Sequence, residues 1–122
     1  MQGEIIVEFQ EVYKSFGKTS ALRGISFKLF KGEILGFIGP NASGKTTTIR
    51  LMLDLYKADQ GKILLFGKEQ SRIFNQVGPQ IGVVLEQPGL YDSLTGSEYL
   101  EVFGGVLGIP KAKRKKRILD LL

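Results

Sequence analysis

The chain has 122 residues, and its 43% of hydrophobic against 24% of charged residues excludes a protein that stays disordered through low hydrophobicity. Without cysteine or histidine it has no disulfide framework, no zinc site built on thiolates or imidazoles and no Ser-His-Asp triad. The net charge of +5 is local, because six of the 17 basic residues lie in 111–117 and the other 11 face 12 acidic residues.

The first part of the chain, residues 1–31, predicts an antiparallel sheet. Residues 4–10 and 25–29 both alternate between apolar and polar side chains. Such alternation is typical of strands with one buried and one solvated face. Turn-forming serine and glycine residues within 14–23 separate the two strands.

The pattern changes in residues 32–88, which predict a core with a parallel sheet. Residues 34–38 and 81–85 are apolar without alternation, as expected of strands buried on both faces. A short strand is predicted at 62–66, between two glycines. An amphipathic helix is predicted by apolar residues at helical spacing, which are Ile49, Met52, Leu53 and Tyr56.

Residues 89–122 predict two helices. Thr95 and Glu98 have the spacing of a capping box before the first of them. Pro110 is placed at the first position of a last helix, 110–122, whose apolar final turn has nothing in the chain to pack on it.

The basic heptad 111–117 lies on this last helix, and we interpret it as a solvated helix face. A sharper alternative is an electrostatic contact with anionic lipid or with a membrane partner. Nucleic-acid binding ranks last, because no aromatic residues interleave with the basic ones.

The strongest signal in the sequence is a full match to the phosphate-binding pattern G-x-x-x-x-G-K-[ST]. The matching residues are Gly39, Pro40, Asn41, Ala42, Ser43, Gly44, Lys45 and Thr46. In such a loop consecutive backbone N–H groups surround phosphate oxygens. The Lys45 ammonium contacts the β- and γ-phosphates, and the Thr46 hydroxyl coordinates Mg²⁺. The alternative is a glycine-rich turn that holds a Lys-Thr pair by chance, but the pattern predicts nucleoside triphosphate binding.

Residues 39–48, including Thr47, resemble the Walker A segment of ATP-binding cassette (ABC) transporter ATPases, with Ala42 where that family usually has glycine. The resemblance covers nearly the whole chain, through 22–27, 31–34, 59–63, 81–84 and 88–95. It implies an α/β P-loop NTPase fold with an antiparallel β subdomain (1–31), a P-loop core (32–88) and the start of a helical subdomain (89–122). The implied ligands are ATP and Mg²⁺. The implied partners are a transmembrane permease subunit and a second ATP-binding subunit, at the cytoplasmic face of the cell membrane.

Two further sites follow from the resemblance. Phe16 falls at the family's A-loop aromatic residue, which stacks on adenine; the alternatives are an aromatic side chain that packs on the sheet, and Tyr13 as the substitute. At the Q-loop, Glu86 occupies the family's glutamine position and Gln87 follows it. Both are candidates, with Thr46, for the Mg²⁺ site, because a carboxylate can also ligate that ion.

The 122 residues contain no L-S-G-G-Q signature, Walker B run, D-loop or H-loop histidine. The resemblance therefore implies the N-terminal half of a nucleotide-binding domain, which holds nucleotide without hydrolysing it and exposes unpaired strand edges. We expect the chain alone to be marginally stable or to self-associate through those edges. The alternatives are a small self-contained P-loop kinase or GTPase, with Glu86 as its acid, and a non-catalytic nucleotide-binding module with a basic interaction helix. No residue indicates the transported substrate or the direction of transport.

Overall fold

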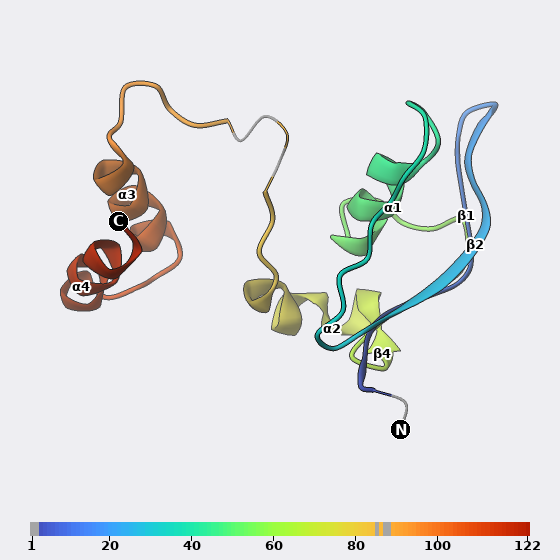
Figure 1. Cartoon of the computed structure of the whole chain (residues 1–122), viewed down its shortest axis with the longest axis horizontal. Coiled ribbons are helices and arrows are strands. Elements are labelled where there is room, and N and C mark those ends of the chain that lie inside the picture. Colours follow the sequence, from blue (N-terminus) through green and yellow to red (C-terminus); the bar gives the residue numbers. More distant parts are fainter. Residues whose placement is uncertain (1–2, 85, 87–88) are drawn as a thin grey trace. The chain divides into compact units, whose positions relative to one another are not determined.

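The computed structural model describes residues 3–84, 86 and 89–122, and the chain divides into two compact units, Met1–Gly82 and Val83–Leu122 (Figure 1). The first unit holds β1 (Ile5–Phe16), β2 (Thr19–Phe30), α1 (Lys45–Met52), β3 (Gln60–Leu65), β4 (Lys68–Glu69), α2 (Gln70–Val77) and the 3-10 helix η1 (Gly78–Gln80). The second unit holds α3 (Gly96–Val106) and α4 (Lys111–Leu121). The subdomain boundaries after residues 31 and 88 stay predictions.

The sheet of the first unit is antiparallel, with the strand order β2-β1-β3-β4. This confirms the predicted antiparallel pair and the short strand near 62–66. Strands β1 and β2 are longer than the alternation indicates, because they continue to a tight turn at Gly17 and Lys18. The predicted strands at 4–10 and 25–29 therefore correspond to the open end of one long hairpin, away from its turn.

A bulge in β1 shapes the core of the first unit. Phe9 and Val12 are both buried although they lie three residues apart, because β1 has one extra residue relative to β2 and to β3 in this region. The extra residue, Glu11, has a positive φ of 46°. Ser26 secures it: its hydroxyl accepts from the Glu11 amide at 2.8 Å and donates to the Glu11 carboxylate at 2.9 Å. Gly61 lies against the bulge so closely that a Cβ there would collide with the Glu11 carbonyl oxygen.

The core itself is one cluster of buried side chains from the sheet and from both of its helices. Its members are Val7, Phe9, Val12, Leu22, Leu51, Ile63, Leu65 and Ile73. Phe27 of β2 stacks on the Phe9 ring with the centroids 4.6 Å apart. The sheet thus supports α1, and α1 begins at the end of the phosphate-binding motif.

The two strands predicted at 34–38 and 81–85 are wrong for the described residues. Residues 34–38 and 81–84 form no strand, and Ile34 and Ile38 are 101% and 99% exposed. Residue 85 lies outside the described residues. An unalternating apolar run becomes a parallel strand only where other strands pair with it, and the described strands pair with one another instead.

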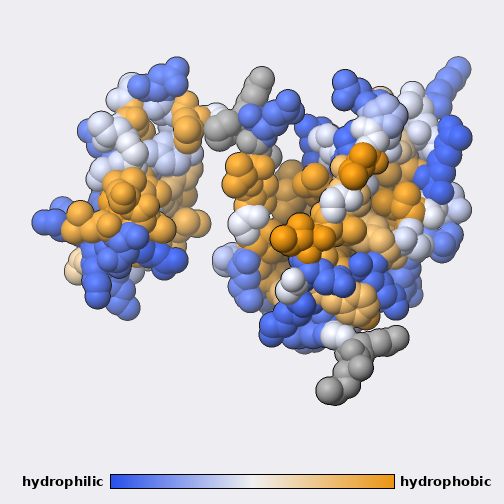
Figure 2. Space-filling model, viewed as in Figure 1, coloured by the Kyte–Doolittle hydropathy of each residue, from blue (hydrophilic) through white to orange (hydrophobic). Residues whose placement is uncertain are grey.

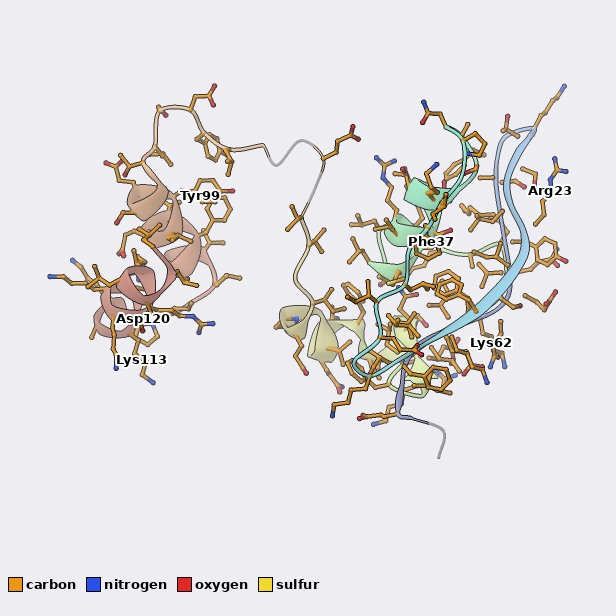
Figure 3. The ribbon with its side chains drawn as sticks, in the orientation of Figure 1. Arg23, Phe37, Lys62, Tyr99, Lys113 and Asp120 are labelled. Carbon is orange, nitrogen blue, oxygen red and sulfur yellow. The ribbon has the colours of Figure 1, made fainter. Side chains whose placement is uncertain are left out.

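Only part of the 34–38 segment packs on the sheet. Phe37, labelled in Figure 3 on the segment between β2 and α1, contacts the Phe27 ring edge-on at 5.4 Å. Ile34 and Ile38 expose their side chains and add to the hydrophobic surface of this unit. Figure 2 shows hydrophobic residues in orange on the surface of the first unit.

Helix α1 is confirmed, and Met52 of the predicted apolar set packs against the core, but the fully buried residues of the helix are different ones. Thr48 and Leu51 are buried, whereas Ile49 is 43% exposed. The helix ends at Met52, so Tyr56 lies beyond it. Gln70, the first residue of α2 and 5% exposed, donates from Nε2 to the carbonyl oxygens of Leu51 at 2.6 Å and Met52 at 2.8 Å. The end of α1 is therefore satisfied by a side chain from a helix that the sequence pattern did not predict.

The second unit is a pair of helices that pack on each other. The predicted last helix is confirmed as Lys111–Leu121, with Pro110 as the residue before its first turn. The expectation that its final turn packs on nothing is wrong for Ile118, which is buried, while Leu119 and Leu122 are exposed.

In the basic heptad one residue is structural and the others face solvent. Arg114 donates from Nη1 to the Glu101 carbonyl oxygen at 3.0 Å and lies against Gly104 of α3, where a Cβ would be 2.9 Å from Arg114 Cδ. The exposed members are Lys111, Lys113, Lys115, Lys116 and Arg117. The interpretation of a solvated face therefore holds for five of the six basic residues.

The capping box predicted at Thr95 and Glu98 is confirmed, since Thr95 Oγ1 accepts from the Glu98 amide at 3.3 Å and the Glu98 carboxylate accepts from the Thr95 amide at 2.8 Å. We expect Thr95→Ala to lower the free energy of unfolding of this unit by about 1 kcal/mol. Thermal melts followed by helical circular dichroism measure the effect, and Ser97→Ala, in the same helical turn, is the control. An unchanged melt for Thr95→Ala would contradict the role of the cap.

The same capping box gives the unit a pH dependence. Hydrogen bonds from the Thr95 hydroxyl, and then from its amide, lower the pKa of Glu98 below its ordinary value. A lowered folded-state pKa means that this contribution is fully present above the unfolded-state pKa of about 4.3 and is lost as the pH falls through the lower folded-state value. Thr95→Ala should therefore flatten the acid limb of the stability profile.

Candidate functional site

The predicted phosphate-binding loop lies between the 34–38 segment and the first turn of α1. Gly44, the residue before the helix, has φ +93°, and a Cβ there would lie 2.7 Å from the Ala21 carbonyl oxygen. Glycine is therefore required at this position, both by the left-handed backbone and by the close approach of β2. The second glycine of the motif thus sets where α1 begins.

Ala42, where the resembled family usually has glycine, also has a left-handed backbone, with φ 63°. A residue with a Cβ pays roughly 1–2 kcal/mol for this conformation. The loop has therefore kept the glycine-type backbone geometry although the side chain has changed.

The Lys45 ammonium lies folded over the loop. Its Nζ donates to the carbonyl oxygens of Gly39 at 2.6 Å and Pro40 at 2.7 Å, and to Ser43 Oγ at 3.3 Å. These contacts place a positive charge inside the turn that the motif forms, where a phosphate group would need it.

Three threonines follow Lys45 in the first turn of α1, and each has a different environment. Thr48 is buried and donates from Oγ1 to the Gly44 carbonyl oxygen at 2.9 Å, which joins the helix to the loop. Thr47 is half-buried, and Thr46 is exposed. The first turn contains no acidic side chain, so the positive end of the helix dipole is not neutralised there.

The donor set fits a magnesium ion that arrives with a nucleotide. Mg²⁺ usually takes one or two protein oxygens and completes its shell with phosphates and water, and the exposed Thr46 hydroxyl beside Lys45 is such an oxygen. Within the described residues no group of three or more acidic side chains could hold a metal ion.

Phe16 lies at the end of β1, next to the hairpin turn, and is 43% exposed. Its ring contacts the Tyr56 ring edge-on, with the centroids 5.2 Å apart, and Lys14 Nζ lies over it at 5.4 Å from the centroid. The substitute candidate, Tyr13, lies against β2, where its hydroxyl would be 2.6 Å from a Cβ at Gly24.

Asp59 holds the end of β1 from the chain segment before β3. Its carboxylate accepts from the Ser15 amide at 2.7 Å and from Lys14 Nζ at 2.8 Å, and its amide donates to the Tyr13 carbonyl oxygen. The hydrogen bond from Lys14, followed by the one from the Ser15 amide, lowers the pKa of Asp59. The sequence analysis missed this residue, because its partners lie 44 and 45 positions away and no local pattern connects them.

The Q-loop candidates fall outside the first unit. Glu86 is exposed and lies in a bend of the second unit, and Gln87 lies outside the described residues. The first unit contains both the loop of 39–46 and Thr47. Phe16 contacts Tyr56, and Tyr56 is bonded to Arg50 of α1, the helix that begins at the end of the loop.

Among the described residues no helix is both long and apolar enough to cross a membrane.

Comparisons with known proteins agree with one another. Residues 22–122 match the family model described as "ABC transporter". The chain is 36% identical over 121 residues to the methionine import ATP-binding protein MetN of Brucella abortus, covering 96% of this chain and 33% of that protein. It is 34% identical over 117 residues to the linearmycin resistance ATP-binding protein LnrL of Bacillus subtilis, covering 96% of this chain and 38% of that protein. The chain thus spans about a third of the length of these two relatives.

A solved structure of an ATP-binding subunit of an ABC transporter matches with a TM-score of 0.73 and 26% sequence identity, over 92% of this chain and 47% of that one.

Proposed function

Since this chain belongs to the ABC transporter family, we propose that it binds Mg²⁺-ATP through residues 39–46, as the nucleotide-binding part of a transport ATPase subunit. The observation that carries the proposal is the loop itself. The complete motif is held between β2 and the start of α1, with the Lys45 ammonium inside its turn.

The loop backbone, Lys45, Thr46 and Phe16 each have a proposed role in binding the nucleotide. Backbone N–H groups of the loop and the N-terminus of α1 bind phosphate oxygens, and Lys45 leaves its carbonyl partners to bind the β- and γ-phosphates. Thr46 would hold Mg²⁺, which neutralises the phosphate charge when bound. Phe16 would stack on the adenine base.

The remaining assignments rest on the family alone. Glu86 and Gln87 are proposed as alternatives for the Q-loop residue. A transmembrane permease subunit and a second ATP-binding subunit are the proposed partners, which would place the protein at the cytoplasmic face of a cell membrane. We also propose that the 122-residue chain binds nucleotide without hydrolysing it, because the family's signature and Walker B motifs are absent from these residues.

The alternative of a small self-contained P-loop kinase or GTPase loses its main support. That alternative needs residues 81–85 as a Walker B strand ending at Glu86, but residues 81–84 form no strand. The relatives are described as ATP-binding proteins of import and resistance systems.

Isothermal titration calorimetry tests the proposal by comparing Mg²⁺-ATP, Mg²⁺-GTP and inorganic tripolyphosphate on the 122-residue chain. We expect all three to bind, with a modest preference for ATP, because stacking on an aromatic ring accepts either base. Release of inorganic phosphate from ATP should not exceed the rate without protein. Failure of all three to bind would refute the function, and strong selectivity for GTP would refute the adenine site.

A further inference from the structure

The ring of Phe16 is held by a second aromatic side chain. Tyr56 lies edge-on to Phe16, with the centroids 5.2 Å apart and the ring planes at 67°. Aromatic pairs in this geometry have a preferred mutual orientation, because the positive ring edge faces the negative ring surface. Tyr56 therefore restricts the orientation of Phe16 at the end of the hairpin.

Tyr56 is held in turn by the helix that the phosphate-binding loop begins. Arg50 of α1 donates from Nη1 to the Tyr56 hydroxyl at 3.1 Å, and its guanidinium carbon lies 5.7 Å from the centroid of the Tyr56 ring. Arg50 lies five residues after Lys45 on the same helix. A continuous set of contacts therefore runs from α1 to the Phe16 ring.

The backbone next to Phe16 is fixed from the same chain segment. Asp59, three residues after Tyr56, accepts from the Ser15 amide at 2.7 Å. It also pairs with Lys14, whose ammonium lies over the Phe16 ring. Residues 56–59 thus hold both the backbone and the ring of the proposed base-stacking residue.

From these contacts we infer that Tyr56 is a positioning residue for nucleobase recognition: it sets the orientation of Phe16 relative to α1, and so relative to the phosphate-binding loop. The inference rests on the proposed function. It concerns only the part of the site that would bind the base, so it predicts different effects on ligands with and without a base. Loss of the Tyr56 ring should weaken ligands that carry a base and leave base-free triphosphates unaffected.

The experiment compares the parent chain with Tyr56→Leu, Tyr56→Met and Tyr56→Phe by calorimetric titration with Mg²⁺-ATP and with inorganic tripolyphosphate. Thermal melts show which variants are folded. Loss of the edge-on ring should weaken ATP binding about three- to tenfold, the size of an aromatic pair contribution, for whichever of Tyr56→Leu and Tyr56→Met folds. Tyr56→Phe loses the hydroxyl but keeps the ring that faces Phe16 and lies beside the Arg50 guanidinium, so it should stay within about twofold of the parent. Tripolyphosphate affinity should not change.

Tyr91→Leu, which removes a 60% exposed tyrosine from the second unit, is the matched control and should bind ATP as the parent does. Unchanged ATP affinity in the leucine and methionine variants, equal losses for ATP and tripolyphosphate, or a Tyr56→Phe loss as large as theirs would overturn the inference and leave the proposed function intact. A parent chain that binds neither ligand would overturn the proposed function, and the inference with it.

Discussion

Replacing Lys45 by alanine is expected to weaken Mg²⁺-ATP binding about ten- to hundredfold, corresponding to the roughly 1.5–3 kcal/mol of a hydrogen bond to a charged group. In the structure this ammonium donates to two carbonyl oxygens and one hydroxyl. A triphosphate offers it negatively charged oxygens instead, which form stronger, charge-assisted hydrogen bonds. The gain on exchanging these partners is what the alanine variant loses, and calorimetry measures it directly.

Lys68→Ala is the control for this measurement. Lys68 is an exposed lysine of β4, so its removal changes the net charge equally without touching the loop. We expect ATP affinity within about twofold of the parent for this variant, since exposed single charges act weakly through solvent. Equal affinity of parent and Lys45→Ala would remove the assignment of residues 39–46 as a phosphate-binding loop.

The largest loss of stability is expected from Gln70→Ala. Its amide is the donor to two carbonyl oxygens at the end of α1, and the side chain is 5% exposed. Without it, the Met52 carbonyl oxygen loses this donor, whereas the Leu51 carbonyl oxygen keeps the Asp54 amide at 3.1 Å. A buried unsatisfied group costs about 1–3 kcal/mol. We expect a decrease of about 1–3 kcal/mol in the free energy of unfolding, measured as a lower urea midpoint.

Gln76→Ala serves as the matched control, because Gln76 is exposed on the same helix. Its effect should stay within about 0.5 kcal/mol. Similar urea midpoints for the two variants would show that water replaces the Gln70 amide and that the contact to α1 does not stabilise the unit.

The parts of this chain that were predictable are those whose cause is local in the sequence. The phosphate-binding motif, the alternation within each strand of the β1–β2 hairpin and the Thr95 capping box each depend on residues within a few positions of one another. A strand at 34–38 depends instead on other strands to pair with, and the described residues supply none, so its apolar pattern alone was misleading. Gln70 and Asp59 escaped prediction for a related reason: their partners lie 18 to 45 residues away.

The residues of the candidate site also fall into those that the sequence could predict and those that it could not. The motif indicated the loop and the start of α1, because glycine, lysine and threonine are required there by the chemistry of phosphate. It gave no indication of Tyr56 or Arg50, whose role depends on a contact between the hairpin end and a segment 40 residues later. The A-loop position of Phe16 came from family resemblance, and the side chains that hold it came from the structure.

The extra residue in β1 determines where the hairpin can lose a residue without turning its side chains to the opposite surface. Side chains alternate along a strand with a period of two, so adding or removing one residue turns everything beyond it to the opposite surface. Val7 and Phe9 face the core on one side of Glu11, and Val12 does so on the other. Because Glu11 is the extra residue, its deletion would place Val12 two positions after Phe9, so the outer half of the strand would keep its facing. A deletion between Val12 and Phe16 would instead turn Phe16 to the opposite surface. The orientation of the proposed base-stacking residue therefore tolerates the loss of the bulge residue but not the loss of a residue nearer the hairpin turn. Among descendants of this sequence, single-residue deletions in β1 should be more frequent at Glu11 than between Val12 and Phe16.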